Sequence, residues 1–328
     1  MDLQQRTRRF GAAVILCALC LRLWEAGVPG RILDFLAQPN MTAFLIYLET
    51  GRDVRFSASD ETFSPFFRES PPPWIPETNP PPEEKPAFSG EDASLVTLSN
   101  SSRKQPDIPA LLAKPLTWEL GQEVPTVLIL HTHTTESYTK TQETYLETSP
   151  YRTLDENYNM LSIGAHVAQL LEDAGIRVIR DETLHDYPSY NGSYVHARNR
   201  LAELLEQYPS VKMVLDLHRD ASGDSGSQLR PLANVGGNQT AQMMLVMGTN
   251  YDAWEENLAL AVKLQVTLEK QNPGIMRPLD LRSQRFNQDL SNGALLIEMG
   301  AAGNTHDEAL LAAEALAEAI ITLAEGTV

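Results

Sequence analysis

Ionisable side chains lie at or near the ends of three strongly apolar segments of the sequence. His131, His133 and Glu136 follow the first segment, His218 ends the second, and Glu298 lies within the third. Imidazole and carboxylate groups are ligands that zinc prefers, and a catalytic zinc ion takes three protein ligands and keeps a position for water. The pattern therefore predicts a metal site, with Zn²⁺ favoured by ligand type.

A third protein ligand is needed beside two histidines. Glu156 stands at the predicted start of the first long helix, where its side chain can point back toward the end of the preceding strand. The same position also suits a purely structural role, because an acidic residue in a first turn interacts favourably with the helix dipole. Both interpretations of Glu156 stay open.

An α/β domain over residues 123–328 is predicted to position these residues. Apolar runs predict strands, and amphipathic segments between them predict helices. The runs are 124–130, 176–183, 211–218, 243–248 and 293–300, and the helical segments are 157–175, 195–209, 257–274 and 306–326. This alternation predicts a mixed or mostly parallel central sheet covered by helices on both faces. Catalytic groups in such sheets lie at the carboxyl ends of strands.

The residues before this domain predict a membrane tether. A basic tail (1–9) precedes an apolar run (10–26), which we interpret as an uncleaved signal anchor because no clean cleavage site follows it. A juxtamembrane helical segment (27–60) and a proline-rich linker (61–122) come next, and Leu95 to Leu98 could pair as a short edge strand. The basic tail would stay in the cytoplasm and the rest would be exported.

Composition excludes several classes of function. The chain of 328 residues has 26 Lys and Arg against 43 Asp and Glu, a formal charge of −17, which disfavours binding to nucleic acid. Its only cysteines, Cys17 and Cys20, lie in the apolar N-terminal run. A disulfide framework, a thiolate zinc site and a cysteine nucleophile are therefore excluded from the domain that follows.

Several motifs give the chain a specific resemblance over about residues 123–310. HTHTTESY, HDYPSYNGSY, DLHRDA, RFNQDLS and ALLIEMG occur in this order. Together they resemble the stage II sporulation protein P family, membrane-anchored cell-wall hydrolases of endospore-forming Firmicutes. The resemblance implies an amidase-3-like, zinc-dependent N-acetylmuramoyl-L-alanine amidase with an additional peptide-cleaving activity. It also implies action on septal peptidoglycan during engulfment, in the intermembrane space of the forespore septum, with stage II sporulation proteins D and M as partners.

The wider amidase pattern implies a role for each of four residues. It places the metal ligands at His133, Glu156 and His218, and the catalytic general base and acid at Glu298. The sequence departs from this pattern where Asp-Pro-Gly is replaced by Leu-His-Thr at residues 130–132. His131 therefore remains a rival of His133, and Glu136 and Glu143 remain rivals of Glu156.

Other residues near these motifs are candidates for binding substrate: His131, Glu136, His185, Arg219 and Arg285. Arg219 could bind a stem-peptide carboxylate, or Arg219 or Arg285 could form a structural ion pair with Glu298. Tyr187, Tyr190 and Tyr194 could stack on sugar rings or pack as a lid. Two alternatives to the amidase remain: a zinc peptidase that cuts only cross-links, and a non-catalytic wall-binding module.

Overall fold

The computed structural model describes residue 88 and residues 90–326, except 117–118, 142–144, 222 and 225–226. These residues belong to one compact unit, Asn79–Val328. The predicted basic tail (1–9), signal anchor (10–26) and juxtamembrane segment (27–60) lie outside the described residues. Within the described part of the chain, no helix has both the length and the apolar character needed to cross a bilayer.

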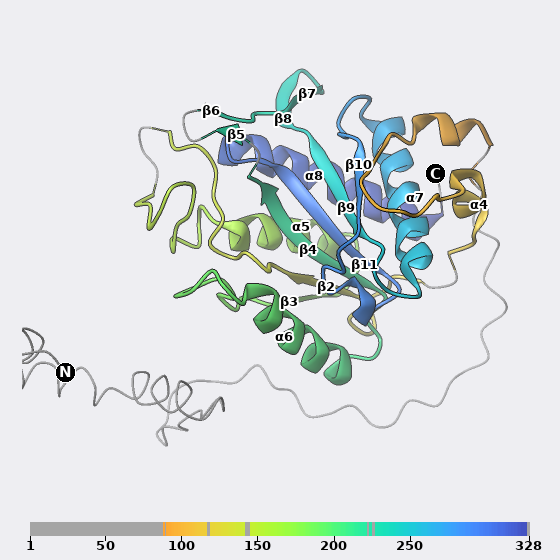
Figure 1. Ribbon diagram of the computed structural model, residues 1–328, viewed down its shortest axis with the longest axis horizontal. Coiled ribbons are helices and arrows are strands. Elements are labelled where there is room, and N and C mark those ends of the chain that lie inside the picture. The colour runs from red at the N-terminus through yellow and green to blue at the C-terminus, as the bar shows by residue number, and fades with distance from the viewer. Residues whose placement is uncertain are drawn as a thin grey trace, which may run out of the picture. The chain divides into compact units, whose positions relative to one another are not determined.

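The centre of the unit is a seven-stranded sheet with the strand order β1-β10-β9-β11-β4-β2-β3 (Figure 1). Its strands are β1 (Leu98–Asn100), β2 (Val127–Leu130), β3 (Val178–Arg180), β4 (Met213–Asp220), β9 (Met243–Gly248), β10 (Leu279–Arg282) and β11 (Ala294–Ala301). The four strands β11, β4, β2 and β3 are mutually parallel, as are β1, β10 and β9. The two parallel blocks meet in an antiparallel pair, β9 and β11. The predicted mixed, mostly parallel sheet is confirmed.

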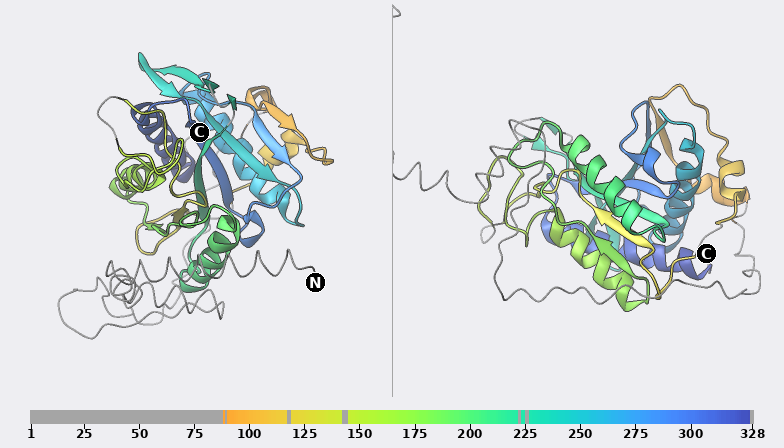
Figure 2. Two further views of the ribbon diagram at one scale, coloured as in Figure 1. Left: turned by 60° about the vertical axis from the view of Figure 1, so that its left-hand side comes forward. Right: turned by 90° about the horizontal axis from the view of Figure 1, so that it is seen from below.

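Helices cover both faces of this sheet. They are α4 (Ile108–Ala113), α5 (Met160–Asp173), α6 (Ser193–Gln207), α7 (Trp254–Gln271) and α8 (His306–Glu325). Side chains of α5, α7 and α8 share the large hydrophobic core with Val127 and Ile129, whereas α6 packs against Leu128 and Leu130 on the other face. The right-hand view of Figure 2 shows α6 on one side of the sheet and α5 with α8 on the other. The predicted two-sided covering is therefore confirmed.

Smaller elements connect or extend this core. They are the 3₁₀ turns η1 (Gly90–Leu95) and η2 (Gln288–Leu290), the ribbon β5 (Gly223–Asp224) with β6 (Ser227–Gln228), and the hairpin β7 (Leu232–Val235) with β8 (Asn238–Ala241). The inner strands of the sheet are covered on both faces, and all four residues of β2 are buried. This explains why β2 reads in the sequence as a continuous apolar run rather than an alternating one.

The folded region begins before residue 123, within the segment 61–122 whose composition predicts a linker. β1 pairs with β10 at the edge of the sheet, with Leu98 opposite Leu279. Leu111 of α4 is buried, and its carbonyl oxygen accepts a hydrogen bond of 2.7 Å from Lys263 Nζ on α7. The apolar stretches in this segment are too short to give a recognisable sequence pattern. Their strand and helix are held by contacts with distant parts of the chain. The edge strand expected at Leu95–Leu98 lies at Leu98–Asn100.

The parallel block of β3, β2, β4 and β11 determines where the functional residues gather. Parallel strands bring their carboxyl ends to the same edge of a sheet. The loop after β2 carries His133 and Glu136, and His218 lies near the carboxyl end of β4. Glu298 of β11 is the register partner of His218. These four residues therefore converge at one edge of the block.

Candidate metal centre

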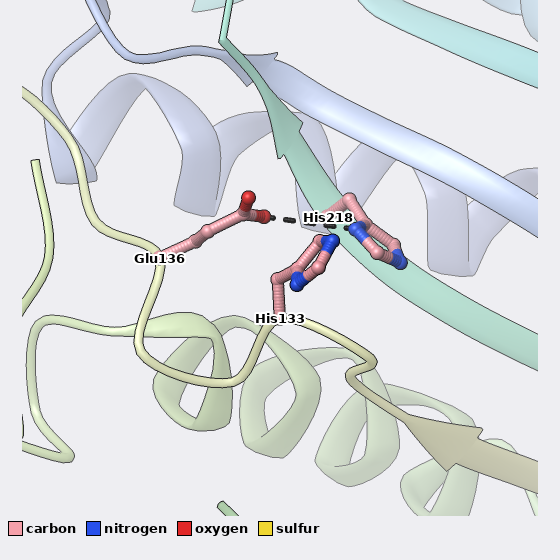
Figure 3. A group of neighbouring side chains, drawn as sticks. All are labelled: His133, Glu136 and His218. Atoms are coloured by element: carbon pink, nitrogen blue, oxygen red, sulfur yellow. Dashed lines mark ion pairs between the residues drawn. The ribbon is translucent and has the colours of Figure 1, made fainter. Parts of the chain in front are cut away.

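Three buried side chains, His133, Glu136 and His218, form a group that could hold a metal ion. Each offers one ligand atom, and these atoms lie within 4.8 Å of one another. Figure 3 shows the Glu136 carboxylate and the His133 ring pointing toward His218, which comes from the neighbouring strand. His218 Nδ1 lies 3.6 Å from Glu136 Oε2. Two imidazoles and one carboxylate match the ligand set of three-ligand catalytic metal sites.

A tight turn after β2 brings His133 and Glu136 to the same point. The Glu136 amide donates a hydrogen bond of 3.1 Å to the His133 carbonyl, which closes a turn of four residues. Thr134 Oγ1 donates to the His131 carbonyl at 2.8 Å and fixes the start of this turn. The Thr135 amide donates to Asp186 at 3.1 Å and ties the turn to the loop after β3. Local hydrogen bonds thus hold both side chains in place.

Asp216 orients His218 from two residues earlier on β4, because residues i and i+2 of a strand share a face. Asp216 Oδ1 lies 2.9 Å from His218 Nε2. The Thr132 amide and hydroxyl donate to the Asp216 carboxylate at 2.8 and 2.6 Å. Burial lowers the pKa of His218, but Asp216 and Glu136 outweigh it and raise the pKa well above its usual value. Without a metal, this imidazole carries a proton between two carboxylates, where positive charge is stabilised.

Glu136 is held in its ionised form. Burial raises its pKa, but the Arg219 guanidinium and His218 outweigh this effect and lower the pKa to about 2. The Arg219 amide donates to Glu136 Oε2 at 3.2 Å, and the Arg152 guanidinium lies 3.5 Å from Oε1. An ionised carboxylate is the form that binds a metal ion.

His133 is held in its neutral form, because burial lowers its pKa to about 4. Its Nδ1 lies 3.2 Å from Ser193 Oγ, and its Nε2 lies 3.2 Å from Tyr190 Oη. The Tyr190 ring stacks on it with centroids 4.6 Å apart, and Tyr194 meets it edge-on. A neutral imidazole can give one nitrogen to a metal ion.

Glu298 lies beside this group on the adjacent strand. Its Oε2 is buried and has no hydrogen-bond partner among the described residues. Burial raises its pKa to about 8, against the opposing effect of His218. No ion pair joins it to Arg219 or Arg285 in the described part of the chain: Arg219 pairs with Glu136, and Arg285 lies 3.8 Å from Asp289. A buried polar atom without a partner is costly and marks a candidate functional group.

The structure does not bring Glu156 into the group. Glu156 is exposed in a turn, and α5 begins only at Met160, after Asn159, whose side chain accepts a hydrogen bond from the Leu161 amide. Glu136 takes the position expected for Glu156. The third rival carboxylate, Glu143, lies outside the described residues.

His131 lies away from the group although it precedes His133 by only two residues. Its Nδ1 is 3.0 Å from the Leu217 carbonyl oxygen, and its ring packs against α5 at Gly164. A Cβ atom on Gly164 would lie 2.4 Å from His131 Nε2, so this contact requires glycine. Burial lowers the pKa of His131 to about 4, and its surroundings are those of a core residue.

The other predicted substrate contacts are already engaged or lie elsewhere. His185 Nε2 lies 2.7 Å from Asp181, and Arg219 donates to the carbonyl oxygens of Ser137 and Tyr151. Arg285 lines a separate cavity of about 490 Å³ at the carboxyl ends of β9 and β10. That edge belongs to the other parallel block, so Arg285 does not join the three-residue group.

Sequence reasoning missed residues that support the group: Arg152, Ser193 and the role of Asp216. The role of Asp216 could have been predicted from the sequence, because Asp216 precedes His218 by two residues on a predicted strand and must share its face. No sequence pattern indicates the role of Arg152, which forms ion pairs with both Asp186 and Glu136. Arg152 lies in a loop, Ser193 at the start of α6 and Asp216 within β4, and only the folded chain brings them together.

Sequence comparison places the chain among known proteins. The sequence model of the family described as Stage II sporulation protein P (SpoIIP) matches residues 76–321. The chain belongs to this family. Stage II sporulation protein P of Bacillus subtilis (strain 168) is 28% identical over 262 residues, which cover 74% of this chain and 61% of that relative. This chain therefore spans less than two thirds of the relative's length. The family that the motifs predicted is confirmed.

Two solved structures are similar to part of this chain. The N-acetylmuramoyl-L-alanine amidase AmiC2 of Nostoc punctiforme is 17% identical with a TM-score of 0.38, covering 61% of this chain and 97% of that chain. The CwlD amidase from Clostridioides difficile, solved in complex with the GerS lipoprotein, is 17% identical with a TM-score of 0.37. It covers 61% of this chain and 98% of that chain.

Proposed function

We propose that this protein is a zinc-dependent peptidoglycan hydrolase that cleaves the amide bond between N-acetylmuramic acid and L-alanine during sporulation. Membership of the stage II sporulation protein P family supports the substrate and the process. The observation that carries the proposal is the pairing of a three-ligand group with an unpartnered carboxyl: Glu298 Oε2 is buried beside His133, Glu136 and His218. Metal-assisted amide hydrolysis uses both parts, a metal ion that polarises the carbonyl group and a side chain that carries the proton.

The three ligands fit a zinc ion in charge and chemistry. Glu136 is ionised, His133 is neutral, and the proton on His218 is the one that a cation would replace. Bound there, zinc would supply a Lewis acid for the scissile carbonyl and lower the pKa of a bound water toward about 7. Asp216 beside His218, and Arg152 and Arg219 around Glu136, would hold the ligands in place.

Glu298 would move the proton. Its carboxylate would take a proton from the attacking water onto Oε2 as the water oxygen bonds to the carbonyl carbon. The same proton would then pass to the departing nitrogen as the carbon–nitrogen bond breaks, leaving a free amino group on L-alanine. A pKa near 8 suits the donating step, and a cation held by the neighbouring ligands would lower that pKa and favour the accepting step.

Purified sacculi provide the test. The full chain, in mild detergent with Zn²⁺, should release peptides whose new amino terminus is L-alanine, together with glycan strands that keep the intact lactyl group, as read by mass spectrometry. Release of peptides cut only within cross-links would identify a peptidase instead. Binding to sacculi without any release would identify a wall-binding module. A chain stripped of metal by a chelator that keeps full activity would contradict the zinc mechanism.

We also propose that the enzyme is anchored in the cell membrane by residues 10–26, with its catalytic domain outside the cytoplasm in the septum. The apolar run behind Arg6, Arg8 and Arg9 supports this orientation. Family resemblance supports stage II sporulation proteins D and M as partners. Fractionation tests the anchor: recovery of the full-length protein mainly in the exported soluble fraction, with a new amino terminus near Ala26, would show a cleaved signal peptide.

A further inference from the structure

Each ring nitrogen of His133 faces a different hydroxyl group. Ser193 Oγ lies 3.2 Å from Nδ1, and Tyr190 Oη lies 3.2 Å from Nε2. A histidine that binds a metal gives one nitrogen to the ion and keeps a hydrogen on the other, which then donates to an outer partner. One of the two hydroxyls must therefore leave its nitrogen when His133 becomes a ligand.

Ser193 is fixed in place. It is the first residue of α6, and its side chain is buried. The helix is anchored behind it, because Arg198 donates two hydrogen bonds of 2.7 and 2.8 Å to Asp289 and Leu201 is buried in the core. The carbonyl oxygen of Tyr194 also accepts a hydrogen bond of 2.8 Å from the side-chain Nδ2 of Asn287. Moving the Ser193 hydroxyl away from His133 would require the first turn of α6 to move.

Tyr190 is held much less firmly. It lies in the loop before α6, and 53% of its surface is exposed. Its ring contacts the His133 ring, and the Arg152 guanidinium carbon lies 4.6 Å from its centroid. Stacking at a half-exposed position costs little to break, because little apolar surface becomes newly exposed. Rotation of the Tyr190 side chain into solvent would free Nε2.

We propose that Ser193 is the residue that orients His133 for metal binding, and that the Tyr190 hydroxyl is a cap on Nε2 that the metal displaces. This inference rests on the metal site of the proposed function. Nδ1–H of His133 then donates to Ser193 Oγ, and Nε2 becomes the ligand atom. The two hydroxyls consequently act on metal affinity in opposite directions: Ser193 strengthens binding, and Tyr190 competes with it.

Zinc affinity of the full chain, measured by competition with a chromophoric chelator, tests this difference in sign. Ser193→Ala should weaken zinc binding by about 10–100-fold, the range typical of losing an outer partner of a ligand. Tyr190→Phe, which keeps the ring and removes only the hydroxyl, should bind zinc as tightly as the wild type or more tightly. Unchanged affinity in Ser193→Ala, or a tenfold or greater loss in Tyr190→Phe, would overturn the proposal.

Matched variants separate this role from a general effect on folding. Ser193→Thr keeps the hydroxyl group and should retain the zinc affinity. Ser193→Val has the shape of threonine but lacks the hydroxyl group, and it should lose the affinity. This pair makes the same comparison if Ser193→Ala does not fold. Tyr187→Phe is the control for Tyr190, since Tyr187 lies half-exposed in the same loop and none of the described contacts joins it to His133. It should leave zinc affinity unchanged.

A second measurement follows Tyr190 itself. In protein labelled with 3-fluorotyrosine, the fluorine resonance missing from Tyr190→Phe identifies this residue among the ten tyrosines. Adding Zn²⁺ should shift that resonance in step with the bound metal, toward the position of a solvent-exposed ring. A resonance that does not move while zinc binds would refute the displacement of Tyr190. A wild-type chain that binds no zinc at all would instead contradict the proposed function.

Discussion

Glu298 of β11 and His218 of β4 are register partners on adjacent parallel strands, so the candidate proton carrier and a candidate ligand are set by one stretch of backbone pairing. Asp216 lies two pairs earlier, opposite Leu296. The distance between the proton-transfer group and the metal ligand is therefore set by the pairing of two strands. Paired strands hold such a distance more rigidly than a loop would.

Replacing Glu298 with glutamine should separate chemistry from metal binding. The amide is nearly isosteric with the carboxyl group but cannot accept a proton from water, so hydrolysis of sacculi should fall by about 10²–10⁴-fold. Zinc content, measured by atomic absorption, should match the wild type. If Glu298→Gln instead lost its zinc, Glu298 would have to be counted as a ligand.

The pH dependence of stability should report the burial of Glu298. Its pKa is about 8 in the folded chain and near 4.5 when unfolded. Between these values the folded state keeps a proton that the unfolded state loses, so this carboxyl makes the free energy of unfolding decrease as pH rises, by at most about 1.4 kcal/mol per pH unit. Urea denaturation of metal-free wild type and Glu298→Gln from pH 5 to 8 measures the effect. Equal slopes for the two proteins would contradict it.

Glu136 and Glu156 can be compared directly as ligands. Glu136→Gln should weaken zinc binding by more than the 10–100-fold typical of an outer partner, because an ionised oxygen ligand is lost. Glu156→Gln should leave zinc content unchanged, because Glu156 is exposed and lies outside the group. Zinc content of both variants decides between them, and the reverse result would restore Glu156 as the ligand.

Alanine variants of His131 and His133 should differ in zinc content. His133→Ala should lose zinc, whereas His131→Ala should keep it, because His131 packs against α5. His131→Ala should lower the free energy of unfolding instead, by about 1–3 kcal/mol, since it leaves the buried Leu217 carbonyl without this contact. Chemical denaturation and metal analysis on the same samples separate the two effects, and loss of zinc only in His131→Ala would reverse the assignment.

Gly164 should tolerate no side chain. Gly164→Ala would place a Cβ atom 2.4 Å from His131 Nε2 and 3.2 Å from Ile129 Cγ2, and overpacking of this kind costs about 1–3 kcal/mol. Gly121→Ala is the matched control, since nothing lies within 4 Å of a Cβ atom built there. Melting temperatures of the two variants should differ by several degrees. Equal stability would show that the contact between α5 and His131 can relax.

Sequence patterns predicted the elements that carry their own signal. Long apolar runs predicted β2, β4 and β11, and the ionisable residues at or near their ends indicated the edge of the sheet where the group lies. The choice of Glu156 depended on counting back to the start of a helix, and the structure starts that helix at Met160 with Asn159 as its cap. The turn that brings Glu136 to His133 is made by hydrogen bonds to other loops, which spacing along the chain does not reveal.

Short elements were missed for a related reason. β1 has only three residues and α4 only six, so neither is long enough to show a hydrophobic period. Ser193 and Tyr190 reach His133 from sixty and 57 positions away in sequence. Such contacts result from the packing of α6 on the sheet, and no local motif contains them.

The pairing of β1 with β10 also determines the order in which the chain can fold. Ser101 and Leu281, which are joined by hydrogen bonds at the end of this pairing, are 180 residues apart in sequence. A chain that emerges from its amino terminus presents β1 and α4 long before β10 and α7 exist. Closing so long a loop has a large entropic cost, and contacts of this range slow folding. The edge strand must therefore wait for its partner, and the unit is completed only after most of the chain has been synthesised.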